Sequence, residues 1–249
     1  MRYLFIILII SISHASCGLL QERAKETTSH EPVVIVANGS GTGPAFRIEL
    51  TPGSSFYYPL MAFWLEDMDG NYIQTLYVAR SVATGIFRFG ESKGNKWVEA
   101  PKRAPQTLPY WAHKRGIRAS DGLYMPEPQN PVADAYTGAT PVTAFILEAR
   151  ADSALKGSFR VLMEINQNWD WNQYWHNNRF PGDSNYAMSA QPAIVYEALI
   201  ETGTGEEPVM MEPAGHSHWS GSSGELFTDI STLTTALEIA GSVKVSIKR

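Results

Sequence analysis

Pro59-Leu-Met-Ala-Phe-Trp-Leu-Glu66 is an apolar run of strand length, and it is followed by Asp67-Met-Asp-Gly70 and Tyr72-Ile-Gln-Thr-Leu-Tyr-Val78. The Asp and Gly residues of the central segment and the alternating side chains of the second arm predict a β-hairpin. The hairpin is rich in aromatic residues that we expect in a sandwich core, namely Phe63, Trp64, Tyr72 and Tyr77.

Short β-prone runs flank this hairpin on both sides. They are Val33–Val36, Phe46–Leu50, Val142–Glu148, Gly157–Ile165, Ala193–Ile200 and Ser242–Ile247. Turn-rich segments such as Asn38–Gly43 separate the runs, and helical periodicity is almost absent, although Leu233–Ile239 could form a short helix. The pattern predicts an all-β fold, an antiparallel immunoglobulin-like β-sandwich with long irregular insertions.

The composition fits a folded globular domain. Of the 249 residues, 44% are hydrophobic and 18% are charged, which permits a real core and argues against disorder. The formal net charge is −5, without a long basic run. A concentrated positive surface is the first requirement for binding nucleic acid, so we expect no nucleic-acid partner.

The N-terminal segment is predicted to direct export and anchoring. Met1–Ile10 is one charge followed by an apolar run that is short for a membrane span, as in a signal peptide. Ser13–Gly18 resembles a lipoprotein cleavage site, in which Cys17, the single cysteine, is lipidated; His14 departs from that motif, so cleavage near Ala15 is the alternative. We expect a signal peptide over residues 1–16, a lipoprotein tether over 17–31 and one β-sandwich domain over 32–249.

The segment Asp134-Ala-Tyr-Thr-Gly-Ala-Thr140-Pro141 indicates a specific covalent chemistry. Small residues surround the hydroxyl of Thr140, which another enzyme would have to activate because threonine is a poor nucleophile. We expect Gly138 to adopt the positive φ of a sharp turn and Asp134 to close that turn through backbone N–H groups. Thr140 would then lie at an exposed, narrow loop tip.

The same segment resembles the Asp-x-x-(Ser/Thr)-Gly-Ala-Thr signature on which bacterial flavin transferases place FMN. The resemblance implies that Thr140 carries FMN through a phosphoester, with FAD as donor, and that Asp134, Thr137, Gly138 and Ala139 belong to the attachment motif. It also implies electron transfer and a membrane redox partner. The alternative is an ordinary Asx-type turn between two strands.

Two further regions contain candidate cofactor contacts. Arg80–Pro141 has little periodicity, which is typical of a functional insertion. Its cations could bind a flavin phosphate and its aromatic side chains could contact the flat flavin ring. These residues are Trp97, Lys102, Arg103, Tyr110, Trp111, His113, Lys114 and Arg115. The second region, Asn166–Trp175, places Trp169, Trp171 and Trp175 among amides. We expect these indoles to form a wall beside the flavin, and the alternative is that they are core residues.

The Trp-rich region also contributes to a family resemblance. Together with Gly215-His-Ser-His218, Ser220-Gly221, Gly224-Glu-Leu and Thr234-Thr-Ala236, it resembles the bacterial periplasmic family called domain of unknown function 2271. The likeness runs from about Phe46 to the C-terminus. Members of that family often carry the Asp-x-x-Thr-Gly-Ala-Thr site and accompany flavin transferases.

Other chemistry has weaker support in the sequence. His216 and His218 would share one face of an extended segment and could meet a metal, with His113, His176 or Glu225 as further ligands. Two ligands do not make a stable zinc site, so they are weak candidates, and no acid–base pair or hydrolase triad is evident. Two hypotheses remain: an anchored, covalently flavinylated electron-transfer protein, or an anchored binding module for a metal or small ligand without flavin.

Overall fold

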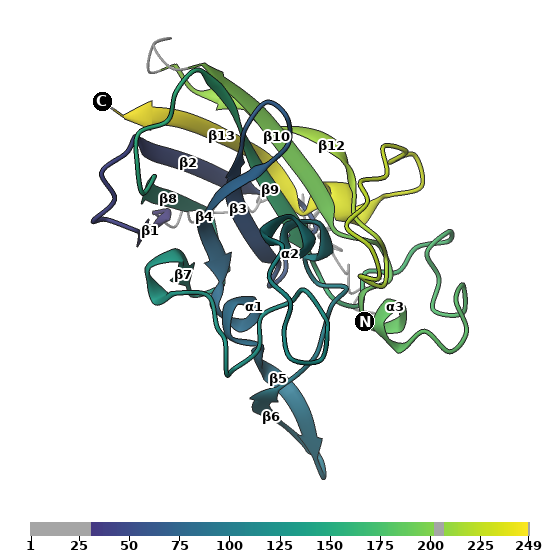
Figure 1. The fold of residues 1–249 in the computed structure, drawn as a ribbon. Coiled ribbons are helices and arrows are strands. Elements are labelled where there is room, and N and C mark those ends of the chain that lie inside the picture. Colours follow the sequence, from purple (N-terminus) through teal and green to yellow (C-terminus); the bar gives the residue numbers. More distant parts are fainter. Residues whose placement is uncertain (1–30, 202–206, 249) are drawn as a thin grey trace, which may run out of the picture.

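The computed structural model describes residues 31–201 and 207–248, which form two packed β-sheets (Figure 1). One sheet has the strand order β1-β8-β2-β13-β11 and the other β12-β10-β9-β3-β4-β7. Their strands are β1 (Val33–Ala37), β2 (Ala45–Pro52), β3 (Leu60–Glu66), β4 (Tyr72–Ala79), β7 (Thr137–Gly138), β8 (Phe145–Arg150), β9 (Ser158–Asn166), β10 (Ile194–Glu201), β11 (Val209–Met210), β12 (Glu212–His216) and β13 (Ala240–Lys248).

The predicted all-β sandwich is confirmed. Each of the eight runs predicted from the sequence coincides with a strand, and the hairpin of β3 and β4 is present. Antiparallel pairing dominates both sheets, but β1 pairs with β8 and β4 pairs with β7 in parallel. The expectation of an entirely antiparallel sandwich is therefore wrong at two edges, because chain segments that reach a sheet edge after long connections are free to pair in either direction.

Turn chemistry explains why the β3–β4 hairpin forms where the sequence predicts it. The Asp67 carboxylate accepts hydrogen bonds from the backbone N–H groups of Asp69 and Asn71, at 2.9 and 2.8 Å. Gly70 adopts a φ of 82°, which residues with a side chain rarely tolerate. The Asn71 side-chain amide also donates to Asp67 Oδ2 at 2.8 Å, and this bond, together with the backbone bonds, lowers the pKa of Asp67 and stabilises the turn with an anionic carboxylate.

Strand β3 is apolar on both faces because both faces of its sheet are covered. Phe63 points into the sandwich core beside Tyr77, whereas Trp64 joins a second cluster on the opposite face. The expectation that the hairpin aromatics are core residues holds for Phe63, Trp64 and Tyr77, which are fully buried. Tyr72 is half-buried at the edge of the second cluster.

The second cluster is built mainly by the insertion between β4 and β8. This insertion contains α1 (Arg80–Thr84), the projecting hairpin of β5 (Ile86–Lys93) and β6 (Lys96–Pro101), α2 (Pro109–Arg115) and a 3-10 turn, η1 (Asp134–Tyr136) (Figure 1). Farther along lie α3 (Ser184–Ser189) and η2 (Thr235–Glu238). The short helix foreseen over 233–239 is confirmed in η2.

No helix among the described residues is both long and apolar enough to cross a membrane. The predicted signal peptide, the lipidation site Cys17 and nearly all of the tether lie outside the described residues.

A buried carboxylate, Glu164 of β9, connects the sheet to α2. Glu164 is fully enclosed and accepts hydrogen bonds from the backbone N–H groups of Tyr110 and Trp111, at 3.2 and 2.8 Å. Burial disfavours the charged form more than these bonds favour it, so the pKa of Glu164 is raised to about 8. The Glu164 carboxyl is therefore protonated at neutral pH.

This proton makes stability depend on pH. Glu164 has a pKa of about 4.5 in the unfolded chain and about 8 in the folded protein, so the folded state binds the proton more tightly between these values. Stability from Glu164 is complete below pH 4.5 and is lost as the pH rises to 8, at about 1.4 kcal/mol per pH unit in mid-window.

We expect Glu164→Gln, which keeps the acceptor oxygen and the volume, to remove this slope. The free energy of unfolding of the wild type and of Glu164→Gln is measured with denaturant from pH 5 to 8. The difference between the two proteins at each pH reports Glu164 alone, because contributions from the buried histidines cancel. Parallel curves for the two proteins would show that Glu164 is already ionised in the folded state.

Candidate functional site

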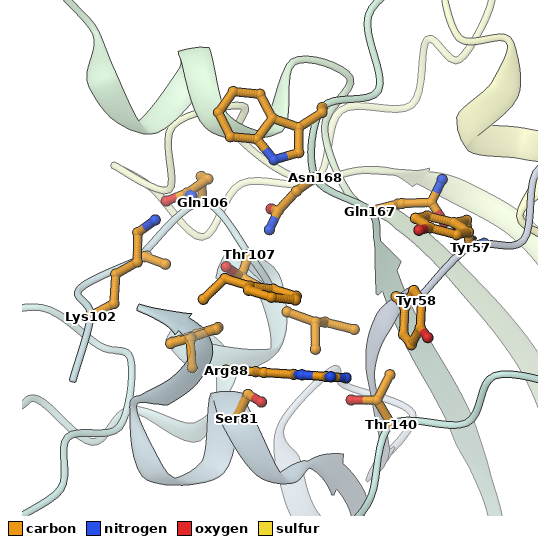
Figure 2. Close-up of a pocket in the computed structure, with 15 residues that line it drawn as sticks. Tyr57, Tyr58, Ser81, Arg88, Lys102, Gln106, Thr107, Thr140, Gln167 and Asn168 are labelled. Carbon is orange, nitrogen blue, oxygen red and sulfur yellow. Dashed lines mark hydrogen bonds between the residues drawn. The ribbon is translucent and has the colours of Figure 1, made fainter. Parts of the chain in front are cut away.

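A cavity of about 570 Å³ opens beside the projecting hairpin (Figure 2). It lies where the segment before β3, the insertion and the Trp-rich loop meet. Its lining residues are Tyr57, Tyr58, Leu60, Ser81, Phe87, Arg88, Phe89, Lys102, Ala104, Gln106, Thr107, Thr140, Gln167, Asn168 and Trp169. The volume is in the range of small-molecule and cofactor sites.

Thr140 lies on the wall of this cavity. The strand β7 ends two residues earlier and pairs with the end of β4, where Thr137 is opposite Val78 and Gly138 is opposite Ala79. Figure 2 shows the Thr140 hydroxyl directed toward the guanidinium of Arg88. Thr140 is half-buried at the sheet margin, so the expectation of an exposed loop tip is wrong.

Gly138 is required for a different reason from the one predicted. It is not among the glycines with positive φ, so it does not form the expected sharp turn. A Cβ at this position would lie 2.7 Å from Cε2 of Tyr77 and 3.3 Å from Cγ2 of Ile35. The Tyr77 hydroxyl also donates a hydrogen bond of 2.8 Å to the carbonyl of Ala139. The motif therefore packs against the sandwich core at a point that admits only glycine.

Asp134 has no direct role in the cavity. Its carbonyl oxygen accepts a hydrogen bond of 3.2 Å from Thr137 Oγ1 within the η1 turn, and its side chain is exposed. The turn is therefore closed by the Asp134 backbone, whereas we had expected its carboxylate to do so. Of the seven motif residues, Thr140 is the one that lines the cavity.

Two cations line the cavity without a carboxylate partner among the described residues. Arg88 lies over the ring of Phe89, 5.3 Å from its centroid, and burial lowers the pKa of Lys102. No Asp or Glu is among the lining residues. Lys102 is half-buried, which is unfavourable for an unpaired cation, whereas Arg88 is exposed to solvent. Together they give the lining a positive charge, so the cavity is suited to an anion.

Most cations predicted beside the cofactor have structural partners instead. Arg103 forms a bidentate pair with Asp121, at 2.6 and 3.0 Å, and Lys114 bonds to the Gly70 carbonyl at 2.7 Å. Arg115 lies over the ring of Trp111. The predicted rings are also elsewhere: Tyr110 and Trp111 are buried in the second cluster, Trp97 is exposed on β6, and His113 bonds to the Pro109 carbonyl.

The Trp-rich loop divides between the cavity and the core. Trp169 is 59% exposed and lines the cavity, and Trp171 contacts its edge with ring centroids 5.5 Å apart. Trp175 is 3% exposed and donates its indole N–H to Thr232 Oγ1. The predicted aromatic wall therefore consists of Trp169 backed by Trp171, whereas Trp175 is a core residue.

Two aromatic residues at the cavity have unusual backbone conformations. Tyr58 has a φ of 52° and Trp169 a φ of 66°, in the left-handed region that bulky residues rarely adopt. The Trp169 N–H donates to the Met188 carbonyl at 3.0 Å, and the Gln167 side chain accepts from the Tyr57 N–H at 2.6 Å. Such strain commonly accumulates at binding sites, where the surrounding structure maintains it.

The weak metal candidates do not form a metal site. His216 stacks on Phe227, 5.2 Å between ring centroids, and His218 stacks on Trp219 at 4.1 Å. Burial lowers the pKa of both imidazoles. The part of the chain that the structure describes contains no group of three or more metal-ligating side chains, with or without His113, His176 and Glu225.

Sequence reasoning missed most of the lining residues, among them the polar and aromatic residues Tyr57, Tyr58, Arg88 and Gln106. The sequence marks these residues only weakly, by a Tyr-Tyr pair before Pro59 and by an arginine between Phe87 and Phe89. Comparisons with protein-family models, curated proteins and solved structures find no match to this chain. The site must therefore be interpreted from its own geometry and from the Thr140 motif.

The contact of Gly138 with Tyr77 gives a stability prediction. Gly138→Ala forces its methyl group against the Tyr77 ring, and overpacking of this kind costs about 1–3 kcal/mol. Gly39→Ala is the matched control, because its nearest neighbour would be 3.9 Å from the new Cβ. Urea unfolding should show a clear loss for Gly138→Ala and little change for Gly39→Ala. Equal stability of the two variants would mean that the close contact does not exist.

Proposed function

We propose that this chain is an extracytoplasmic flavoprotein, anchored by lipid at Cys17, that carries FMN covalently on Thr140 and acts in electron transfer. The observation that carries the proposal is the position of Thr140: its hydroxyl lies on the wall of a cavity that also presents two unpaired cations and several aromatic rings. An ordinary Asx-type turn without a cofactor would not require cations and aromatic rings around Thr140.

The lining residues fit the chemistry of a flavin nucleotide. A phosphodiester at Thr140 keeps one negative charge, and the guanidinium of Arg88 is directed toward that hydroxyl (Figure 2). Tyr58 and Trp169 are polar-edged aromatic residues that suit a flat heteroaromatic ring. The absence of lining carboxylates avoids repulsion of the phosphate and of a ring that gains negative charge.

Attachment would proceed by transfer from FAD in a flavin transferase. The Thr140 oxygen forms a bond to the phosphorus on the FMN side of the pyrophosphate, the bond to the bridging oxygen breaks, and AMP leaves. The hydroxyl proton passes to a base of the transferase, because no Asp, Glu or His lines the cavity beside Thr140. Arg88 stabilises the phosphodiester that results.

The bound flavin would supply reversible uptake of electrons from a reduced redox protein and their release to an oxidised one at the membrane. The chain sets the conditions for that exchange. Lys102 stabilises negative charge at the ring, and Trp169 covers one side of the cavity. Tyr57 and Trp169 are 71% and 59% exposed, which leaves the mouth open to a partner.

The attachment is tested by intact-mass analysis after co-expression with a flavin transferase and export. The wild type should gain the mass of one FMN less water, and Thr140→Ala should gain none. Thr137→Ala is the matched control: its hydroxyl bonds to the Asp134 carbonyl away from the cavity, so the gain should persist. An unmodified wild type that still binds free FMN would instead make the chain a non-covalent binding module.

Tryptophan emission tests whether the ring occupies the cavity. An indole in contact with flavin is quenched, so flavinylated wild type should emit less than folded Thr140→Ala. The difference should come from Trp169, which lines the cavity, and should shrink strongly when Trp169→Phe is introduced into both proteins. Trp175→Phe, in the core, should leave the difference nearly unchanged. Quenching that is insensitive to Trp169→Phe would place the flavin outside the cavity.

A further inference from the structure

Gln106 is a buried amide with an unused acceptor at the cavity wall. The residue is 2% exposed and lines the cavity, and its Oε1 has no hydrogen-bond donor among the described residues. Buried polar atoms are almost always paired, because an unpaired one loses its bonds to water without replacement. An orphaned acceptor at a cavity is a position where a ligand, or an ordered water in its place, can supply the donor.

The position of Gln106 is fixed by its backbone. Its carbonyl accepts a hydrogen bond of 3.1 Å from Asn166 Nδ2, and the next N–H, of Thr107, bonds to Ala104 at 3.1 Å. From behind, Gly221 packs so closely that an added Cβ would lie 2.2 Å from the Pro105 carbonyl oxygen. The side chain can rotate its amide, but the segment that carries it cannot withdraw from the cavity.

The other amides of the cavity are not equivalent to Gln106. Gln167 uses both ends of its amide, since it accepts from the Tyr57 N–H and donates to the Ser55 carbonyl at 3.1 Å. Asn168 is exposed and is hydrated when no ligand is present. Gln106 is thus the buried amide of the cavity wall whose Oε1 accepts no hydrogen bond from the described residues.

We propose that Gln106 recognises the imide edge of the flavin ring, an inference that rests on the proposed attachment at Thr140. That edge presents an N–H between two carbonyl oxygens, and a primary amide matches it: Oε1 accepts from the imide N–H and Nε2 donates to a neighbouring carbonyl. The match requires the amide to rotate so that both atoms face the ring edge.

The arrangement of the lining residues supports this orientation. Figure 2 shows Gln106 and Lys102 at the end of the cavity away from Thr140 and Arg88. A flavin whose phosphate lies at Thr140 would extend its ring toward Gln106 and Lys102. Reduction increases the electron density on the ring carbonyls, so a donated hydrogen bond from Gln106 favours the reduced state.

Gln106→Met tests the inference, with Gln74→Met as the matched control. Gln74 is also a buried glutamine, but its amide is satisfied, donating to the Arg150 carbonyl at 3.2 Å and accepting from the Asp152 N–H at 2.8 Å. In the flavin-free Thr140→Ala background, Gln74→Met should lower the melting temperature. Gln106→Met should leave it unchanged or raise it, because it removes an unpaired acceptor.

The flavinylated proteins give the second comparison. Gln106→Met should retain covalent FMN by mass, but its preference for the reduced ring should weaken about tenfold, which lowers a two-electron midpoint potential by about 30 mV. Its visible flavin spectrum should shift as well. Gln74→Met should match the wild type in potential and spectrum.

The outcomes separate the two proposals. A wild type without covalent FMN overturns the attachment at Thr140. Covalent FMN in every protein, with the same potential and spectrum in Gln106→Met as in the wild type, overturns the role of Gln106 alone. A melting temperature that falls in flavin-free Gln106→Met would also contradict it, because the amide would then have a structural partner.

Discussion

Tyr77 joins the core of the sandwich to the candidate site. Its ring is buried between the two sheets, its edge touches Gly138, and its hydroxyl donates to the Ala139 carbonyl. Burial raises the pKa of Tyr77, so the hydroxyl remains a protonated donor at any physiological pH. The residue before Thr140 is thereby held by the buried sandwich core, and the orientation of Thr140 depends on core packing.

The cavity exists because one sheet is covered on both faces. The sandwich core occupies one side of the β3–β4 hairpin, and the insertion closes over the other with Trp64 and Trp111 at the centre of its cluster. The cavity forms at the margin of that second layer, where the insertion meets Tyr58 and Trp169.

Local signals in the sequence predicted the strands and the hairpin well, because turn residues such as Asp67 and Gly70 and period-two alternation act over a few positions. They also identified Thr140 and Trp169. They could not reveal Arg88 or Gln106 as site residues, since these reach the cavity only through the packing of distant segments. The roles of Gly138 and Trp175 were misjudged for the same reason: one is set by a ring 61 positions away from it, and the other by packing in the core.

The proposed function requires a flavin that is bonded to Thr140 and lies within the cavity. A crystal structure of the protein purified after co-expression with a flavin transferase tests both points at once. We predict continuous electron density from the Thr140 oxygen through a phosphate beside Arg88 to a ring between Tyr58 and Trp169. An unmodified Thr140 with an empty cavity, or a ring that lies outside it, would contradict the account.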